Sequence, residues 1–259
     1  MIDLIDTHAH LDEQSFEAEI DEIVERASAA GVREIITIGT TADSCRRAIS
    51  LAEKYPSVWA AVGIHPNYAV QATADDWRVV CELSRHPRVV AVGETGLDRF
   101  WDHTPLDLQV DYFERHIALS REISKPFIVH CREAEAETLV VLDRAASTGP
   151  LRGVMHSFCG SPETARRCLD HGLWLSFSGM LTYKKNEALR ELAATVPADR
   201  ILIETDCPYL APTPHRGKRN EPAFVARTAA MLGEARGLTL PEIADLTTAN
   251  ARILFPLGN

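Results

Sequence analysis

Short apolar runs alternate with amphipathic stretches along the chain. Between residues 16 and 30, apolar side chains from Ile20 to Ala27 recur at the spacing of one helix face. The run at 34–38 is rich in β-branched residues and ends at a glycine, which is typical of a buried strand. Apolar runs of this kind predict eight strands, at residues 4–10, 34–38, 58–64, 89–92, 127–129, 153–155, 173–177 and 201–203.

Helical patterns fall between these strands, and two more follow the last one. They cover residues 16–30, 42–54, 74–85, 106–123, 133–146, 162–171, 186–194, 221–236 and 240–253. Strands that alternate with helices and are apolar throughout indicate a parallel sheet covered by helices. Eight such units predict an α/β fold, a single (β/α)8 TIM barrel that forms one domain over residues 1–259. A doubly wound open sheet would also accept this pattern and is the alternative.

Composition and charge restrict the kind of function. The chain has 259 residues, of which 46% are hydrophobic and 25% charged, as in ordinary globular proteins. Its formal net charge is −10 and its pI about 5.5, which argues against a protein that coats nucleic acid through a broad basic surface. Any polyanion must therefore be held locally, by metal ions or by a small basic loop.

The chain gives no sign of export or membrane insertion. The N-terminus leads directly into the first strand, and no later apolar run is as long as a membrane span. Six cysteines are scattered without a CxxC pair, so we interpret them as reduced thiols. We expect a cytoplasmic protein with no membrane partner, as a monomer or small homo-oligomer.

Residues of the types that bind metals follow most of the predicted strands. His8 and His10 are two positions apart in an extended run, so both imidazoles can point at one place. In a barrel, the side chains that do chemistry lie at the carboxyl ends of the strands. The further residues of this kind at strand ends are His65, Glu94, Asp98, His130, His156, Glu204 and Asp206.

This inventory exceeds what one metal ion needs. A catalytic zinc-like site usually takes three protein ligands, so two ions that share a bridging carboxylate fit better. Glu204 should share a side of its strand with Asp206, which leaves open that one of these acids lies behind the ligands. We interpret His65 as a hydrogen-bonded residue next to the ligands rather than a ligand. The other histidines should be solvated, namely His86, His103, His116, His171 and His215.

A basic cluster follows the last strand at residues 215–222. Three cations surround a glycine there, and the cluster would lie beside the mouth of the barrel, where barrels often bind phosphate. Arginine offers a bidentate fork to phosphate oxygens and lysine a point charge. The alternative is an ordinary solvated loop. The candidate substrate contacts are therefore His65, Arg132, Arg216, Lys218 and Arg219.

Seven ordered motifs give the chain a family resemblance. They are DTHAHLD at 6–12, GIHP at 63–66, GETGLD at 93–98, IVHCREA at 128–134, HSFCG at 156–160, ETDCPYLAP at 204–212 and RGKRNEP at 216–222. With them the chain resembles the TatD family of metal-dependent deoxyribonucleases, amidohydrolase-like barrels, almost from end to end. The family more often has isoleucine at the position of Thr95 and an aromatic residue at that of Arg99. These two differences leave the exact choice of substrate open.

The resemblance implies a ligand set and an activity. The implied metal ligands are His8, His10, Glu94, His130, His156 and Asp206, with Glu94 bridging. The implied enzyme hydrolyses phosphodiester bonds of DNA, acting from a strand end with a metal-activated hydroxide. Glu94 and Asp206 would be the catalytic carboxylates, because Asp206 would orient that hydroxide or take its proton. Two divalent ions are expected, Mg²⁺, Mn²⁺ or Zn²⁺.

Two other functions use the same ligands. One is an amidohydrolase-like enzyme that acts on a small amide, ester or lactone, since metal and hydroxide serve that chemistry too. An uncharged substrate of this kind would not require the basic loop. The other is a metal-stabilised barrel that binds a partner with little catalysis, although a complete ligand set speaks against it.

Overall fold

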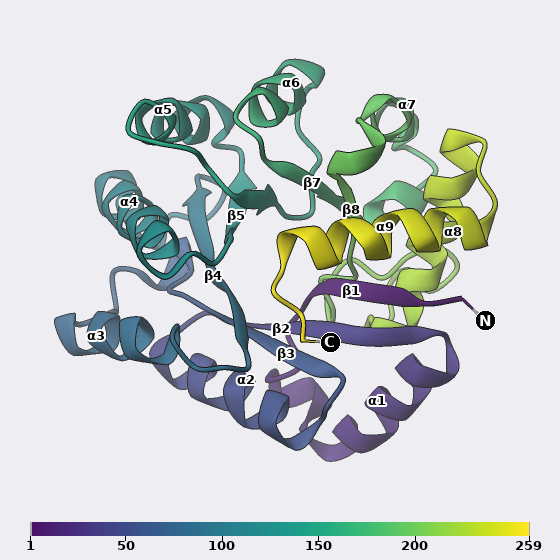
Figure 1. The fold of residues 1–259 in the computed structure, drawn as a ribbon, viewed down its shortest axis with the longest axis horizontal. Coiled ribbons are helices and arrows are strands. Elements are labelled where there is room, and N and C mark those ends of the chain that lie inside the picture. The colour runs from purple at the N-terminus through teal and green to yellow at the C-terminus, as the bar shows by residue number, and fades with distance from the viewer. Residues whose placement is uncertain (1, 259) are drawn as a thin grey trace.

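The computed structural model describes residues 2–258 and contains one eight-stranded sheet (Figure 1). Neighbouring strands are parallel and follow one another in chain order. The strands are β1 (Leu4–Ala9), β2 (Val32–Gly39), β3 (Val58–Val62), β4 (Val89–Asp98), β5 (Phe127–Arg132), β6 (Gly153–Met155), β7 (Trp174–Phe177) and β8 (Ile201–Ile203). All eight predicted strands are therefore present.

The helices surround the sheet, as Figure 1 shows. They are α1 (Ile20–Ala29), α2 (Ala42–Lys54), α3 (Ala74–Leu83), α4 (Leu106–Ile123), α5 (Glu135–Ala146), α6 (Pro162–Asp170), α7 (Glu187–Thr195), α8 (Val225–Arg236) and α9 (Leu240–Leu254). Two predicted helices begin instead as 3-10 turns, at Gln14–Glu19 before α1 and at Pro222–Phe224 before α8. Three further 3-10 turns lie at Pro66–Tyr68, Gly179–Thr182 and Ala198–Arg200.

The first and last strands meet, which distinguishes a barrel from an open sheet. Ala9 forms a parallel bridge with Cys207, and the His10 N–H donates to the Cys207 carbonyl over 2.8 Å. The Asp206 N–H donates to the His8 carbonyl over 2.9 Å. The predicted barrel is confirmed, because an open doubly wound sheet would leave these edges unpaired.

Apolar strand residues divide between the inside and the outside of the barrel. Alternate residues of a strand point to opposite faces, so neighbours such as Ile35 and Ile36 belong to different buried clusters. The cluster of Ile36 also contains Phe255, which follows α9 and is fully buried. Leu257, in the segment after α9, also packs against this cluster. The ligand-type residues lie at the carboxyl ends of the strands, where the side chains are polar.

β4 is longer than the predicted strand at 89–92. It continues to Asp98, so Glu94 lies within the strand rather than beyond its end. Gly93 and Gly96 flank this acid with φ of +130° and +131°, and a Cβ at Gly96 would lie 2.1 Å from the His130 carbonyl oxygen. The glycines therefore let β4 approach β5 closely at the point where Glu94 faces His130.

The prediction that His116 is solvated is wrong. This residue of α4 is fully buried, and its Nε2 accepts a hydrogen bond from the Ile64 N–H over 3.0 Å. Its Nδ1–H donates to the Tyr112 carbonyl over 2.6 Å. Burial lowers the pKa of His116 to about 4, so the ring is neutral. His116 thus connects α4 to the segment that follows β3, one residue before His65.

Across residues 2–258 the helices are too short or too polar to cross a bilayer. The cytoplasmic location stays a prediction.

Candidate metal centre

His8 and His10 bring their imidazoles together at the carboxyl end of β1. Their Nε2 atoms are 3.3 Å apart, and both side chains are buried. This is the result of the two-residue period of an extended chain, which places alternate side chains on one face. The predicted convergence is confirmed, while the role of the two residues as metal ligands stays a prediction.

Glu94 lies at the middle of the cluster and presents one carboxylate oxygen to each side. Oε1 lies 2.7 Å from His130 Nδ1 and 2.9 Å from His156 Nε2. Oε2 lies 3.3 Å from His8 Nε2 and 3.7 Å from His10 Nε2. A carboxylate placed between two groups of imidazoles has the arrangement that a bridge between two cations requires.

Hydrogen bonds outside the cluster fix the orientation of three imidazoles. His10 Nδ1 lies 3.3 Å from the Ile38 carbonyl oxygen, His130 Nε2 lies 3.1 Å from Asp98 Oδ2, and His156 Nδ1 lies 3.2 Å from Glu204 Oε1. Each partner is an acceptor, so each of these ring nitrogens carries the proton of the neutral imidazole. The other nitrogen of each ring therefore presents a lone pair to the cluster.

These lone pairs face carboxylate oxygens, which is the clearest sign that the residues fit a metal. Besides the contacts to Glu94, His10 Nε2 lies 3.4 Å from Asp206 Oδ1. Acceptors this close in a buried site are unfavourable unless a proton or a cation lies between them. Imidazole nitrogen and carboxylate oxygen suit zinc, manganese and similar ions. Donor atoms lie within 4.8 Å of one another in three groups, His8–Glu94–His156, His8–His10–Asp206 and His65–Glu94–His130.

The protonation of the cluster also favours a cation. Burial alone would raise the pKa of Glu94, but the surrounding imidazoles, above all those of His156 and His65, hold it well below its usual range. Burial, reinforced by His156, lowers the pKa of His8. Ionised carboxylate and neutral imidazole are the forms that bind metals. Burial opposes charge on His10, His130 and His156, but the nearby carboxylates raise the pKa values of all three imidazoles, which reflects the need for positive charge beside these carboxylates.

Asp206 reaches the cluster from the segment after β8. Its Oδ1 lies 3.4 Å from His10 Nε2 and 3.7 Å from His8 Nε2. Its backbone is left-handed, with φ of +57°, a conformation that costs energy for a residue with a side chain and that clusters at functional sites. The neighbouring Thr205 holds this turn, because its N–H and hydroxyl donate to buried Asp6 over 2.8 and 2.6 Å.

Glu204 lies behind the cluster, whereas Asp206 faces it. The sequence leaves open which of these two acids lies behind the predicted ligands. Glu204 Oε1 accepts from His156 Nδ1 and, over 2.7 Å, from the Ser157 N–H. Asp98 stands behind His130 in the same way. Carboxylates in this position orient an imidazole and make it a stronger ligand. The sequence places Asp98 among the residues of metal-binding type, in the GETGLD motif, but does not predict its contact with His130.

His65 joins the cluster as a hydrogen-bond donor. Its Nδ1 accepts the Asn67 N–H over 3.1 Å, so the neutral ring carries its proton on Nε2. That nitrogen lies 3.4 Å from Glu94 Oε1. The geometry favours the sequence interpretation of His65 as a residue that supports a ligand.

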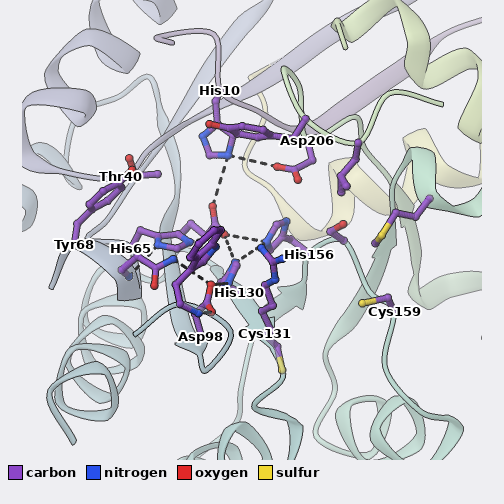
Figure 2. Close-up of a pocket in the computed structure, with 18 of the residues that line it drawn as sticks. His10, Thr40, His65, Tyr68, Asp98, His130, Cys131, His156, Cys159 and Asp206 are labelled. Atoms are coloured by element: carbon purple, nitrogen blue, oxygen red, sulfur yellow. Dashed lines mark hydrogen bonds and ion pairs between the residues drawn. The ribbon is translucent and has the colours of Figure 1, made fainter. Parts of the chain in front are cut away.

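A cavity of about 600 Å³ opens above the cluster. In Figure 2, His10 and Asp206 lie on one side of it, with His65 and His130 on the other. Of the five candidate substrate contacts, His65 and Arg132 line this cavity. Three aromatic residues that the sequence reading did not single out as contacts also line it, Tyr68, Trp101 and Tyr209.

The basic loop lies outside the lining of this cavity. Arg219 Nη2 forms an ion pair with Glu19 Oε1 over 2.8 Å, and the Arg216 guanidinium lies 4.0 Å from the centre of the Tyr183 ring. Lys218 is exposed. The role of these three cations as phosphate contacts stays a prediction. Arg99 pairs with Glu137 over 2.5 Å.

Comparisons with known proteins agree with this architecture. The family described as TatD related DNase matches residues 5–256. The uncharacterized metal-dependent hydrolase YabD of Bacillus subtilis is 42% identical over 255 residues, covering 98% of this chain and 100% of that protein. The 3'-5' ssDNA/RNA exonuclease TatD of Salmonella typhimurium is 34% identical over 257 residues, covering 97% of this chain and 98% of that protein.

A solved structure also agrees. The crystal structure of YJJV, a TatD homolog from Escherichia coli, superposes with a TM-score of 0.91 at 32% identity and covers 98% of both chains. A barrel with an imidazole and carboxylate cluster at its mouth, together with these relatives, defines a metal-dependent hydrolase. The chain belongs to the TatD family.

Proposed function

We propose that this hydrolase cleaves phosphodiester bonds of single-stranded DNA and begins at a strand end. The observation that carries the proposal is the two-sided placement of Glu94, which offers one oxygen to His130 and His156 and the other to His8. Sites with two cations are common in enzymes that hydrolyse phosphodiesters. The name of the Salmonella relative, a 3'-5' ssDNA/RNA exonuclease, supports the same substrate class.

The six predicted ligands would hold the two cations, with Glu94 between them. Bound cations would polarise the scissile phosphate and lower the pKa of an attacking water. Burial would raise the pKa of Asp206, but His10 and the other nearby imidazoles, His8 and His156, lower it overall. Asp206 is therefore ionised at neutral pH and would orient the water or accept its proton. Arg132, on the cavity wall, would hold a phosphate that does not react.

A second function has one observation in its favour. The basic loop lies outside the cavity lining, so Arg132 is the one arginine or lysine among the described residues that line it. A cavity with few cations also accepts a small amide, ester or lactone, because the same cluster can activate water for that reaction.

Salt dependence separates these functions at Arg132. We expect Arg132→Ala to raise KM for a DNA oligonucleotide. The variant should also flatten the salt dependence: the slope of log kcat/KM against log salt concentration should decrease in magnitude by about 0.7, the value for one lost phosphate contact on a single strand. A minimal phosphodiester should keep most of its rate, since it engages the cluster and little else. The matched control Arg166→Ala removes a surface arginine of α6 that pairs with Glu163 and Asp170.

The basic loop needs its own variant. Arg216→Ala combined with Lys218→Ala leaves the Arg219 ion pair in place. If the loop binds distant phosphates, this double variant raises KM for long oligonucleotides more than for dinucleotides. The nuclease proposal fails if the wild type ignores DNA, hydrolyses an uncharged ester efficiently, and loses nothing in either variant.

A further inference from the structure

Exposed aromatic side chains gather at the mouth of the cavity. Among the described residues, the large apolar side chains that are most exposed include four aromatic ones, Tyr68, Phe100, Trp101 and Tyr209. Three of the four aromatic ones, Tyr68, Trp101 and Tyr209, line the cavity. The fourth, Phe100, precedes Trp101. Exposed apolar surface that collects beside a site marks it as a place where a ligand packs.

Asp98 connects the backbone of Trp101 to the predicted metal ligand His130. The N–H groups of Phe100 and Trp101 donate to Asp98 Oδ1 over 2.9 and 3.0 Å. The other oxygen of Asp98 accepts from His130 Nε2 over 3.1 Å. One carboxylate thus fixes both a predicted ligand and the backbone of the exposed loop. The position of Trp101 is therefore defined relative to the predicted site of reaction.

A guanidinium lies among these rings. The Arg132 Cζ is 3.7 Å from the centre of the Phe100 ring and 5.7 Å from that of Trp101. Such cation–π contacts hold the side chain in place without using its N–H donors. Those donors remain suited to a phosphate oxygen. The loop after β4 and the end of β5 thus offer flat apolar faces next to a cation.

Two tyrosines reach the mouth from other loops. Tyr68 follows β3, and its ring lies 5.8 Å from that of His65, on the His65 side of the cavity (Figure 2). Tyr209 follows β8, with its ring 6.0 Å from that of His10. The Tyr209 hydroxyl and Glu13 Oε1 are 3.2 Å apart, which holds the ring in place. Aromatic rings therefore border the cluster on at least two sides.

We propose that this aromatic rim, Tyr68, Trp101 and Tyr209, is a stacking subsite for unpaired nucleobases, with Trp101 holding the base of the terminal nucleotide. Arg132 binds the phosphate next to that base. Stacking on an aromatic ring accepts every base because each has a flat face, and it requires that the base be unpaired. The inference rests on the proposed nuclease function and deepens it, since it assigns recognition of the substrate to the base as well as the phosphate.

The test compares two oligonucleotides and two variants. One single-stranded substrate carries an ordinary terminal base, and the other carries a tetrahydrofuran residue without a base at that position. We expect wild-type kcat/KM to be about 10-fold higher with the base than without it. Trp101→Ala should lower kcat/KM about 10-fold with the base and little without it, whereas Trp101→Phe should keep most of the preference. Val140→Ala, an exposed residue of α5, is the matched control.

Three outcomes decide between the possibilities. A wild type that cleaves both oligonucleotides while Trp101→Ala keeps the full preference for the base overturns the subsite alone. An equal loss on both oligonucleotides and on a minimal phosphodiester, with reduced metal content, shows a structural role for Trp101 and also overturns it. A wild type that cleaves neither oligonucleotide overturns the nuclease proposal and the subsite together. Quenching of tryptophan fluorescence by a non-cleavable oligonucleotide, reduced in Trp101→Phe, would support the subsite independently of turnover.

Discussion

Glu204 Oε1 lies 3.2 Å from Nδ1 of His156, so a buried acid that follows the last strand orients an imidazole that follows the sixth strand. The contact determines which nitrogen of His156 faces Glu94. It also separates the two acids of the ETD segment, since Asp206 joins the cluster and Glu204 stands behind it. Metal binding by this protein should therefore depend on a residue that touches no metal.

The first prediction concerns that residue. Glu204→Gln keeps the shape of the side chain but removes its charge, so His156 becomes a weaker and less firmly oriented ligand. We expect metal affinity to fall about 10- to 100-fold while the barrel stays folded. Competition with a chelating dye measures the affinity, and Glu163→Gln on α6 is the surface control. Unchanged affinity would mean that Glu204 plays no part in the metal centre.

The second prediction concerns the ligands themselves. His130→Ala and His156→Ala should lose bound metal and activity together, because each removes a donor that faces Glu94 Oε1. The circular dichroism spectrum should change little, since the core lies below the mouth. Metal analysis of the purified variants checks the loss. Full metal occupancy in both variants would show that the ligands are wrongly assigned.

The third prediction separates binding from chemistry at Asp206. If this residue mainly handles the proton of the attacking water, Asp206→Asn should keep much of its metal and lose on the order of 100-fold or more in turnover. If it is mainly a ligand, the metal content falls instead. Single-turnover rates and metal content, measured on the same sample, distinguish the two. Near-normal turnover would exclude both roles.

The fourth prediction is a pH dependence of stability that arises at His116. Burial lowers its pKa to about 4 in the folded protein, from a usual value of 6.5. Between these values the unfolded chain binds more protons than the folded one, so the free energy of unfolding decreases as pH falls from 6.5 towards 4. This residue contributes up to about 3 kcal/mol to that decrease.

Urea denaturation at several pH values tests this prediction with His116→Gln. The variant should be less stable at pH 7, because the Ile64 N–H and Tyr112 carbonyl lose their partners, yet its stability should fall less steeply on acidification. His103→Gln removes an exposed histidine and controls for the loss of an imidazole. Parallel pH curves for wild type and His116→Gln would contradict the assignment.

The fold and the convergence of the cluster could be predicted because both follow from local rules. Apolar runs between amphipathic stretches indicate parallel strands and helices, and ligand-type residues at the ends of parallel strands must meet. The convergence of His8 and His10 could be predicted from the two-residue period of an extended chain alone. The extension of β4 to Asp98 was missed because Gly93 and Gly96 resemble the end of a strand, although their backbone continues the pairing with β5.

Other features depend on contacts between distant residues. Glu204 and Asp206 are two positions apart, yet their side chains have different partners because Asp206 follows the strand in a left-handed turn. His116 is buried through its bond to Ile64, 52 residues away. Arg219 of the basic loop pairs with Glu19, 200 residues away. No pattern along the chain encodes such partners.

Metal-dependent release of nucleotides tests the proposed function most directly. The protein would be stripped with a chelator, restored with Mg²⁺, Mn²⁺ or Zn²⁺, and incubated with single-stranded oligonucleotides labelled at either end. We expect mononucleotides from one end when a metal is restored, none from the stripped protein, and little turnover of an uncharged ester. An intact oligonucleotide beside efficient hydrolysis of the ester, with metal bound, would contradict the proposal that this hydrolase acts on DNA.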